Sequence, residues 1–180
     1  MIIIFSRKKY SLMKGKIYCI MPYRMGEDKK YRLINHTADL GIEVYGEGLQ
    51  ELFSNAGFAL FDIMTDISKV KETKKKVITV EGNDLEQLMV NWLNDLLYLY
   101  DVEGLLFKRF EVQEVGIRSS EYLIPQSAIR NPYYLKALIA GECYDQDRHV
   151  IETAVKAATY HQIQVVKENG KWRARIIIDL

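Results

Sequence analysis

A polar turn near residue 40 carries side chains that could bind a metal ion. His36, Thr37 and Asp39 lie between segments 31–34 and 42–45, in which apolar and polar residues alternate as in half-buried strands. A simpler interpretation is that Thr37 and Asp39 bond only nearby backbone amides, as residues of polar turns commonly do. The turn is therefore a candidate site with two open interpretations.

The end of the sequence is the second candidate. The strand-like run 175–178 is followed directly by Asp179 and Leu180, with no polar tail. A strand that ends in this way would hold the Asp179 carboxylate and the terminal carboxylate of Leu180 in a fixed position, where they offer oxygen ligands to a hard cation. The alternative is that a sheet ends here without further function.

The two candidates would form one site if both segments reached the same edge of a sheet. Asp39, Asp179 and the terminal carboxylate would then repel one another unless a cation lay between them. Ligation by oxygen alone favours Ca²⁺ or Mg²⁺ over Zn²⁺. The sequence alone does not show that the segments meet.

Common catalytic signatures are absent from the sequence. It has no glycine-rich phosphate loop, no G-x-S-x-G segment and no H-E-x-x-H segment. The three histidines, His36, His149 and His161, are far apart, so a catalytic triad or a histidine-rich zinc site would need remote segments. This pattern argues against an ordinary hydrolase.

Two helices are predicted from the spacing of apolar residues. Apolar side chains recur every three or four residues from Leu49 to near Thr65, and again from Leu85 to Tyr100. Asp84 and Gln87 form a capping-box pattern before the second helix, and Gly104 is expected to end it.

Strands are predicted for most of the remaining chain, because it is rich in β-branched and aromatic residues. Residues 69–76 are predicted to form a basic loop, 118–132 a loop insertion, and Glu168-Asn169-Gly170 a hairpin turn. Besides 31–34 and 42–45, the predicted strand segments are 77–80, 133–144, 155–166 and 172–178, and segment 105–117 is predicted to form a long strand or a hairpin. The predicted fold class is α+β, a two-layer sandwich with a mainly antiparallel sheet and two helices packed on one face.

The bulk composition is that of one globular domain, with 180 residues of which 48% are hydrophobic and 27% charged. A net charge of +1 argues against a strongly basic nucleic-acid binder. Cys19 and Cys143 form no C-x-x-C pair and indicate free thiols, so we expect a cytoplasmic protein with no membrane partner. Residues 1–28 precede the periodic pattern and are treated as an extension of uncertain status, and residues 29–180 as a single domain.

Several ordered motifs resemble the archease family, and together they span Tyr31–Leu180. They are His36-Thr37-Ala38-Asp39-Leu40-Gly41, segment 59–66, Trp92-Leu93-Asn94-Asp95-Leu96-Leu97-Tyr98, Gly141-Glu142, Asp147-Arg148-His149, segment 155–161 and Ile178-Asp179-Leu180. Each motif is weak alone, but their common order and spacing indicate a family member.

The resemblance implies a function. Archeases are accessory proteins of the RtcB-type RNA ligase, which joins exon halves in tRNA splicing. The resemblance implies that this protein promotes guanylylation and repeated turnover of the ligase, is not itself an enzyme, and meets tRNA through the ligase. It also implies a divalent ion, most often calcium, bound by Asp39, Asp179 and a backbone or terminal oxygen of Leu180.

Other polar residues of these motifs are candidates for a functional surface. Lys156 could offer its charge to a nucleotide phosphate or to an acidic group of a partner, although it equally fits the solvent face of a strand. His36, Glu142, His149 and His161 could line the same site, although a histidine is more often structural than a ligand. The apolar motif residues are expected in the core because of their helical spacing, namely Phe61, Trp92, Leu93 and Leu97.

Two other functions remain open. The same carboxylates could hold the catalytic ion of a phosphoryl-transfer enzyme or nuclease. Alternatively, the basic loop could contact phosphates in a plain RNA-binding module, although such runs are usually only solvated. The lysines of that loop are Lys69, Lys71, Lys74, Lys75 and Lys76.

Overall fold

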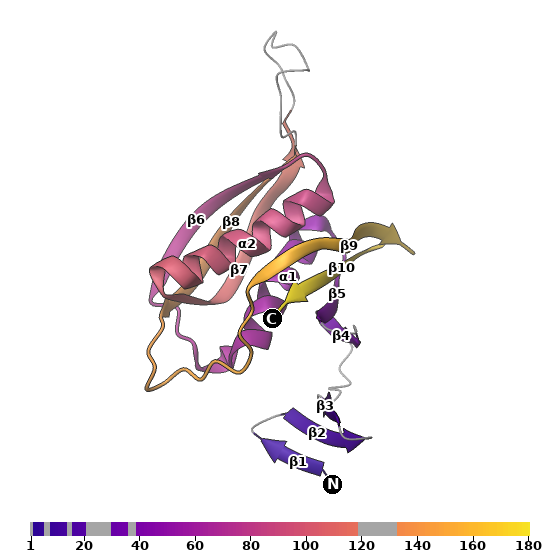
Figure 1. The fold of residues 1–180 in the computed structure, drawn as a ribbon. Coiled ribbons are helices and arrows are strands. Elements are labelled where there is room, and N and C mark those ends of the chain that lie inside the picture. Colours follow the sequence, from indigo (N-terminus) through magenta and orange to yellow (C-terminus); the bar gives the residue numbers. More distant parts are fainter. Residues whose placement is uncertain (1, 6–7, 14–15, 21–29, 36–38, 119–132) are drawn as a thin grey trace.

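The computed structural model of the chain describes residues 2–5, 8–13, 16–20, 30–35, 39–118 and 133–180. Near the N-terminus, β1 (Ile2–Phe5), β2 (Lys8–Met13) and β3 (Lys16–Ile20) form an antiparallel sheet in that order (Figure 1). The sequence pattern assigned no element to this segment. His36 and Thr37 of the candidate turn, and residues 119–132 of the predicted loop insertion 118–132, lie outside the described residues.

Two further antiparallel sheets contain the other strands. One has the order β4-β5-β10-β9 and the other β6-β8-β7. The strands are β4 (Tyr31–Asn35), β5 (Leu40–Gly46), β6 (Lys74–Gly82), β7 (Leu105–Ile117), β8 (Tyr133–Cys143), β9 (Ala157–Glu168) and β10 (Lys171–Asp179). The predicted strands are thus confirmed, and 105–117 forms one long strand with two register shifts.

Two helices, α1 (Leu49–Met64) and α2 (Leu85–Glu103), follow the predicted apolar stripes within the described residues. The Asp84 side chain accepts a hydrogen bond from the backbone N of Gln87 (2.6 Å), and Gln87 Oε1 in turn accepts from the backbone N of Asn83 (2.7 Å). Gly104 ends α2 in the left-handed conformation, with φ of 63°. The predicted capping pattern therefore forms, with Asn83 in place of Asp84 as the backbone donor.

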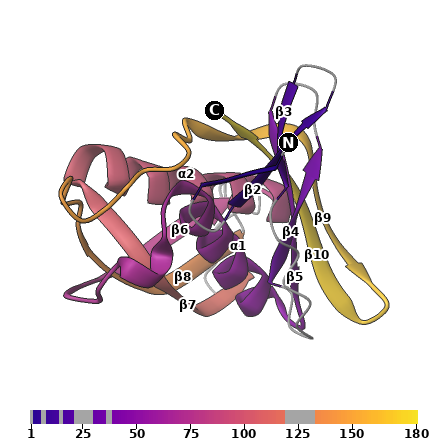
Figure 2. The ribbon, with the colours of Figure 1, turned by 90° about the horizontal axis from the view of Figure 1, so that it is seen from below.

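Both helices contact both of the larger sheets. α1 packs on β5 and β7, and α2 packs on β9 and β6. Figure 2 shows the two helices between the sheets. The predicted class, α+β with antiparallel strands and two helices, is confirmed, and the structure adds that the strands divide into two sheets around the helix pair.

The core lies where the helices meet the sheets. Phe61, Trp92 and Leu93 have no exposed surface and Leu97 is 2% exposed, as predicted for these motif residues. Trp92 Nε1 donates a hydrogen bond to the backbone O of Phe53 (2.9 Å), which satisfies its one polar group inside the core. This bond joins the middle of α2 to the first half of α1.

The predicted basic loop 69–76 is wrong in its second half. A short 3₁₀ turn, η1 (Ile67–Lys69), is followed by buried Val70, and Lys74 already begins β6. β6 is an edge strand, where exposed lysines are common because they discourage pairing with other chains. Among the described residues, no helix is long and apolar enough to span a membrane.

Candidate functional site

The register of β5 and β10 brings the two predicted carboxylates to the same end of these two central strands. Ile178 of β10 pairs with Leu40 of β5. Asp39 precedes Leu40 and Asp179 follows Ile178, so antiparallel continuation of this register sets Asp39 opposite Asp179. Side chains directly opposite in an antiparallel pair lie on the same face, with Cβ atoms about 4.5–5.5 Å apart.

The chain end is held at the same place by the start of β9. Ala157 pairs with Asp179, and the backbone N of Lys156 donates to the backbone O of Asp179 (2.9 Å). Lys156 Nζ donates to the O of Leu180 (2.5 Å). A positive charge therefore already lies at the chain-end oxygens, and Lys156 has a partner within its own chain.

The chemistry of these residues fits a hard cation. Asp39 is half-buried and Asp179 and Leu180 are exposed, so carboxylate and chain-end oxygens are within reach of solvent. Over the part of the chain that is described, no three His, Cys, Asp or Glu side chains form a metal-binding group. The predicted set needs only two such side chains, because Leu180 supplies a main-chain or terminal oxygen. Oxygen donors of this kind suit Ca²⁺.

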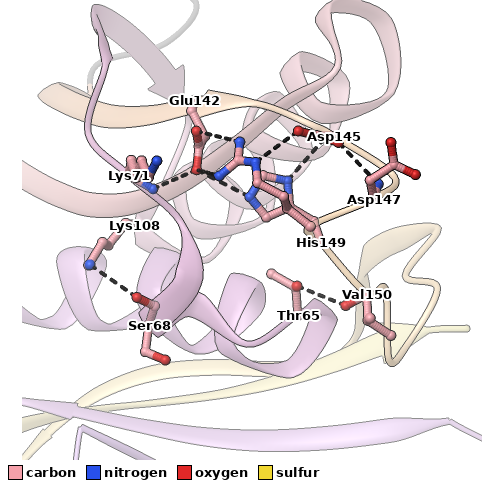
Figure 3. Close-up of polar contacts among 10 residues, drawn as sticks. Thr65, Ser68, Lys71, Lys108, Glu142, Asp145, Asp147, His149 and Val150 are labelled. Carbon is pink, nitrogen blue, oxygen red and sulfur yellow. Dashed lines mark hydrogen bonds and ion pairs between the residues drawn. The ribbon is translucent and has the colours of Figure 1, made fainter.

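Glu142 and His149 come together in a buried cluster at the end of β8. Glu142 Oε2 accepts from Arg148 Nη2 (2.8 Å), and Glu142 Oε1 accepts from the backbone N of Lys71 (2.8 Å) and pairs with His149 Nε2 (3.1 Å). Arg148 also donates to Asp145 (2.8 Å) (Figure 3). Glu142 is 5% exposed and His149 is 2% exposed.

The protonation of this cluster follows from its hydrogen bonds. The backbone N of Asp145 donates to His149 Nδ1 (3.0 Å), so the ring proton of neutral His149 is inferred to sit on Nε2 and to point at Glu142. The hydrogen bonds from Arg148, with those from Lys71 and His149, lower the pKa of Glu142 to about 2 although burial opposes this. Glu142 is therefore ionised at neutral pH.

The cluster fixes the connection between β8 and β9. Thr65 Oγ1 at the end of α1 donates to the backbone O of Val150 (2.9 Å), and the backbone N of Glu152 donates to the O of Met64 (2.8 Å). This connection continues directly into Lys156. Glu142 and His149 therefore lie at the start of the connection that leads to Lys156, and their side chains are bonded within the cluster.

The remaining predicted surface residue that is described, His161, lies exposed on β9. Sequence reasoning missed the ion pairs of Arg148 with Glu142 and Asp145. The spacing of Asp145 and Arg148, three residues apart beside a histidine, was the available signal. It also missed the two hydrogen bonds that join Asn94 to β9, for which the sequence holds no local sign.

Comparison with known proteins agrees with this fold. Residues 31–180 match the Archease protein family. Protein archease of Methanosarcina mazei is 37% identical over 154 residues, covering 86% of this chain and 98% of that protein. Protein archease of Pyrococcus abyssi is 38% identical over 153 residues, covering 84% of this chain and 99% of that protein.

A solved structure shows the same fold. The solution structure of protein 1598 of Methanobacterium thermoautotrophicum is 28% identical, with a TM-score of 0.66 over 84% of this chain and 99% of that one. The matched family segment contains both helices, both larger sheets and every predicted site residue. The chain therefore belongs to the archease family.

Proposed function

We propose that this protein is a metal-binding activator of an RtcB-type RNA ligase in tRNA splicing or RNA repair. It promotes guanylylation of the ligase and its multiple turnover, and it turns over no substrate of its own. The ion is a divalent metal, Ca²⁺ in the first instance. Two observations support this proposal: the chain belongs to the archease family, and carboxylate residues lie at the same end of β5 and β10.

The observation that carries the proposal is the register of β5 and β10. This register sets residues from opposite ends of the family segment at the same end of β5 and β10. They are Asp39, Asp179 and Leu180, and each carries oxygen atoms that could bind a metal ion. Carboxylates gathered in this way favour a bound cation, because a cation lowers their mutual repulsion. When bound, the ion supplies a fixed positive charge at this end of β5 and β10.

Other residues of the chain hold the proposed ligands at the chain end in place. Lys156 holds the chain end through its hydrogen bonds to Asp179 and Leu180. The Glu142 cluster anchors the segment that leads into Lys156. The result is a polar surface that a ligase can contact, and the net charge of +1 argues against a strongly basic nucleic-acid binder.

Guanylylation of the ligase tests the proposal. The fraction of ligase labelled by radioactive GTP would be measured with wild type, Asp39→Ala and Asp179→Ala proteins, each shown to be folded. Asp101→Ala is the matched control, because Asp101 is an exposed carboxylate on α2. We expect stimulation by wild type and Asp101→Ala and its loss in the other two variants.

Either of two results would contradict the proposal. A folded, Ca²⁺-loaded wild type that leaves labelling unchanged is not an activator of that ligase. Metal-dependent cleavage of RNA or nucleotides by the isolated protein, abolished in Asp39→Ala and Asp179→Ala, would instead identify a phosphoryl-transfer enzyme or nuclease.

A further inference from the structure

The Asn94 side chain binds both backbone groups of one residue on β9. Asn94 Nδ2 donates to the backbone O of Ala158 (3.1 Å), and the backbone N of Ala158 donates to Asn94 Oδ1 (2.8 Å). β9 is the last strand of its sheet. Asn94 therefore gives Ala158 the two hydrogen bonds that a further strand would otherwise provide.

Ala158 belongs to the short stretch that holds the chain end. Ala158 pairs with Ile178, and its neighbour Ala157 pairs with Asp179. Lys156, one residue earlier, bonds the O atoms of Asp179 and Leu180. Asn94 thus supports the outer side of this stretch, and the inner side pairs with the end of β10, where the proposed ligands Asp179 and Leu180 lie.

This stretch has little support from the rest of β9. Residues 157–159 pair with β10, and regular pairing resumes only at Gln164 after a register shift. Gln162, within the irregular part, has φ of 52°, which is rare for a residue with a side chain. A bulge of this kind disrupts the ladder, so three residue pairs stand apart from the remainder.

The helix that carries Asn94 is firmly anchored. Trp92, Leu93 and Leu96, on either side of it in sequence, are fully buried. Asparagine is a weak helix former, because its side chain competes for backbone hydrogen bonds. Its place in the middle of α2 is compensated by the two hydrogen bonds to Ala158.

We infer that Asn94 is a positioning residue for the metal site, which fixes β9 so that Asp179 and Leu180 face Asp39. The inference rests on the proposed site but concerns a residue that touches none of its ligands. Asn94 acts through the backbone of Ala158 and the paired strand β10. Its loss is expected to loosen the chain end while the core remains intact.

Asn91 provides a matched control on the same helix. Asn91 Nδ2 donates to the backbone O of Glu81 (2.8 Å), and Asn91 Oδ1 accepts from the Tyr160 hydroxyl (3.2 Å). Asn91→Ala therefore also removes two hydrogen bonds of an asparagine on α2, but none to the backbone of β9. Asn94→Ser replaces Asn94→Ala if the latter does not fold.

The test combines amide hydrogen exchange without added metal and calorimetric titration with Ca²⁺. In Asn94→Ala, the amides of Ala158 and Lys156 are expected to exchange about tenfold faster, because the stretch loses its outer support. The Ca²⁺ dissociation constant is expected to rise about 10- to 100-fold, as for loss of a group that orients metal ligands. Asn91→Ala should change neither quantity.

The two readouts separate this inference from the proposed function. Unchanged exchange at Lys156, or equal changes in Asn94→Ala and Asn91→Ala, would overturn the role of Asn94 whatever the metal result. A wild type that binds no Ca²⁺ would overturn the proposed metal site and the positioning of its ligands with it. Faster exchange with unaltered Ca²⁺ affinity would show that Asn94 is structural only.

Discussion

At the scale of single residues, the polar side chains near the chain end do two different kinds of work. Buried Glu142 bonds both Arg148 and His149 and also accepts from the backbone N of Lys71, so this cluster holds backbone in place. Asp39 and Asp179 instead lie at the ends of β5 and β10, within reach of solvent, where Lys156 donates a hydrogen bond to the O of Leu180. The first group belongs to the fold, and the second is the candidate binding site.

Glu142→Gln should lower stability in a pH-dependent way. The pKa of Glu142 is lower in the folded protein, at about 2, than in an unfolded chain, so its ionisation stabilises the fold above about pH 4.3 and this contribution is lost as the pH falls towards 2. At pH 7 the variant should lose about 2–4 kcal/mol of unfolding free energy, because Arg148 and His149 lose a buried partner. Denaturant unfolding from pH 7 to pH 2 measures this difference.

Glu103→Gln is the control for that experiment. Glu103 pairs with Lys76 at the surface, where the two side chains are 40% and 36% exposed. An exposed pair contributes at most about 1 kcal/mol, so this variant should stay close to wild type at every pH. A difference between wild type and Glu142→Gln that does not shrink in acid would contradict the role given to the Glu142 carboxylate.

Asp39→Asn and Asp179→Asn should each weaken Ca²⁺ binding without unfolding the protein. Each change removes one negative charge from the proposed site and keeps nearly the same shape. Loss of a residue that only orients a ligand already costs about 10- to 100-fold in affinity, so loss of a ligand charge should cost at least about 100-fold. Calorimetric titration tests this, and equal affinity for wild type and both variants would exclude these ligands.

At the scale of elements, the sequence predicted what depends on local pattern. The apolar spacing gave both helices within a few residues, and Asp84, Gln87 and Gly104 marked the ends of α2. The predicted hairpin between β9 and β10 is also confirmed. Asn169 and Gly170 have φ of 51° and 83°, and positive φ at two successive residues is what a tight hairpin turn requires.

Elements whose character depends on distant partners were harder to predict. Lys74, Lys75 and Lys76 look like a loop in sequence, yet they form a strand because β8 pairs with them. The division of the strands into two sheets likewise depends on which remote segments pair. Local propensity carries no information about such pairing, because β preferences depend on neighbours.

Gly141→Ala should destabilise the protein far more than Gly104→Ala. A Cβ at Gly141 would lie 1.9 Å from the backbone O of Leu106, so β7 and β8 would have to separate. We expect a loss of about 2–4 kcal/mol. Gly104 has open space around it but φ of 63°, so alanine there should cost only about 1–2 kcal/mol. Thermal or denaturant unfolding compares the two, and equal losses would contradict the close approach of β7 and β8.

At the scale of the whole molecule, the site is a product of long-range register. Asp39 and Asp179 are separated by nearly the whole family segment, and the register sets them opposite each other only because β5 and β10 are neighbours in one sheet. The sequence could nominate both residues from their type and place, but it could not show that they meet. The role of Asn94 could not be predicted from the sequence, although it lies in one of the motifs, because its partner Ala158 is 64 residues away.

Removal of residues 1–28 should leave the family segment folded and active. Both helices and both larger sheets lie within residues 31–180, the segment that matches the family. The unfolding free energy should change by less than about 1 kcal/mol, which is small beside the stability of a typical domain. Denaturant unfolding and Ca²⁺ titration of the shortened protein test this, and loss of cooperative unfolding would show that the N-terminal segment belongs to the domain.

Multiple-turnover RNA ligation by an RtcB-type ligase tests the central claim most directly. With the ligase limiting, the number of RNA ends joined per ligase molecule would be counted without this protein, with wild type, and with folded Asp39→Ala or Asp179→Ala. We predict several joining events per ligase with wild type, and with either variant no more than the ligase achieves alone. Equal turnover in all four reactions would contradict the claim that this protein is a metal-dependent activator.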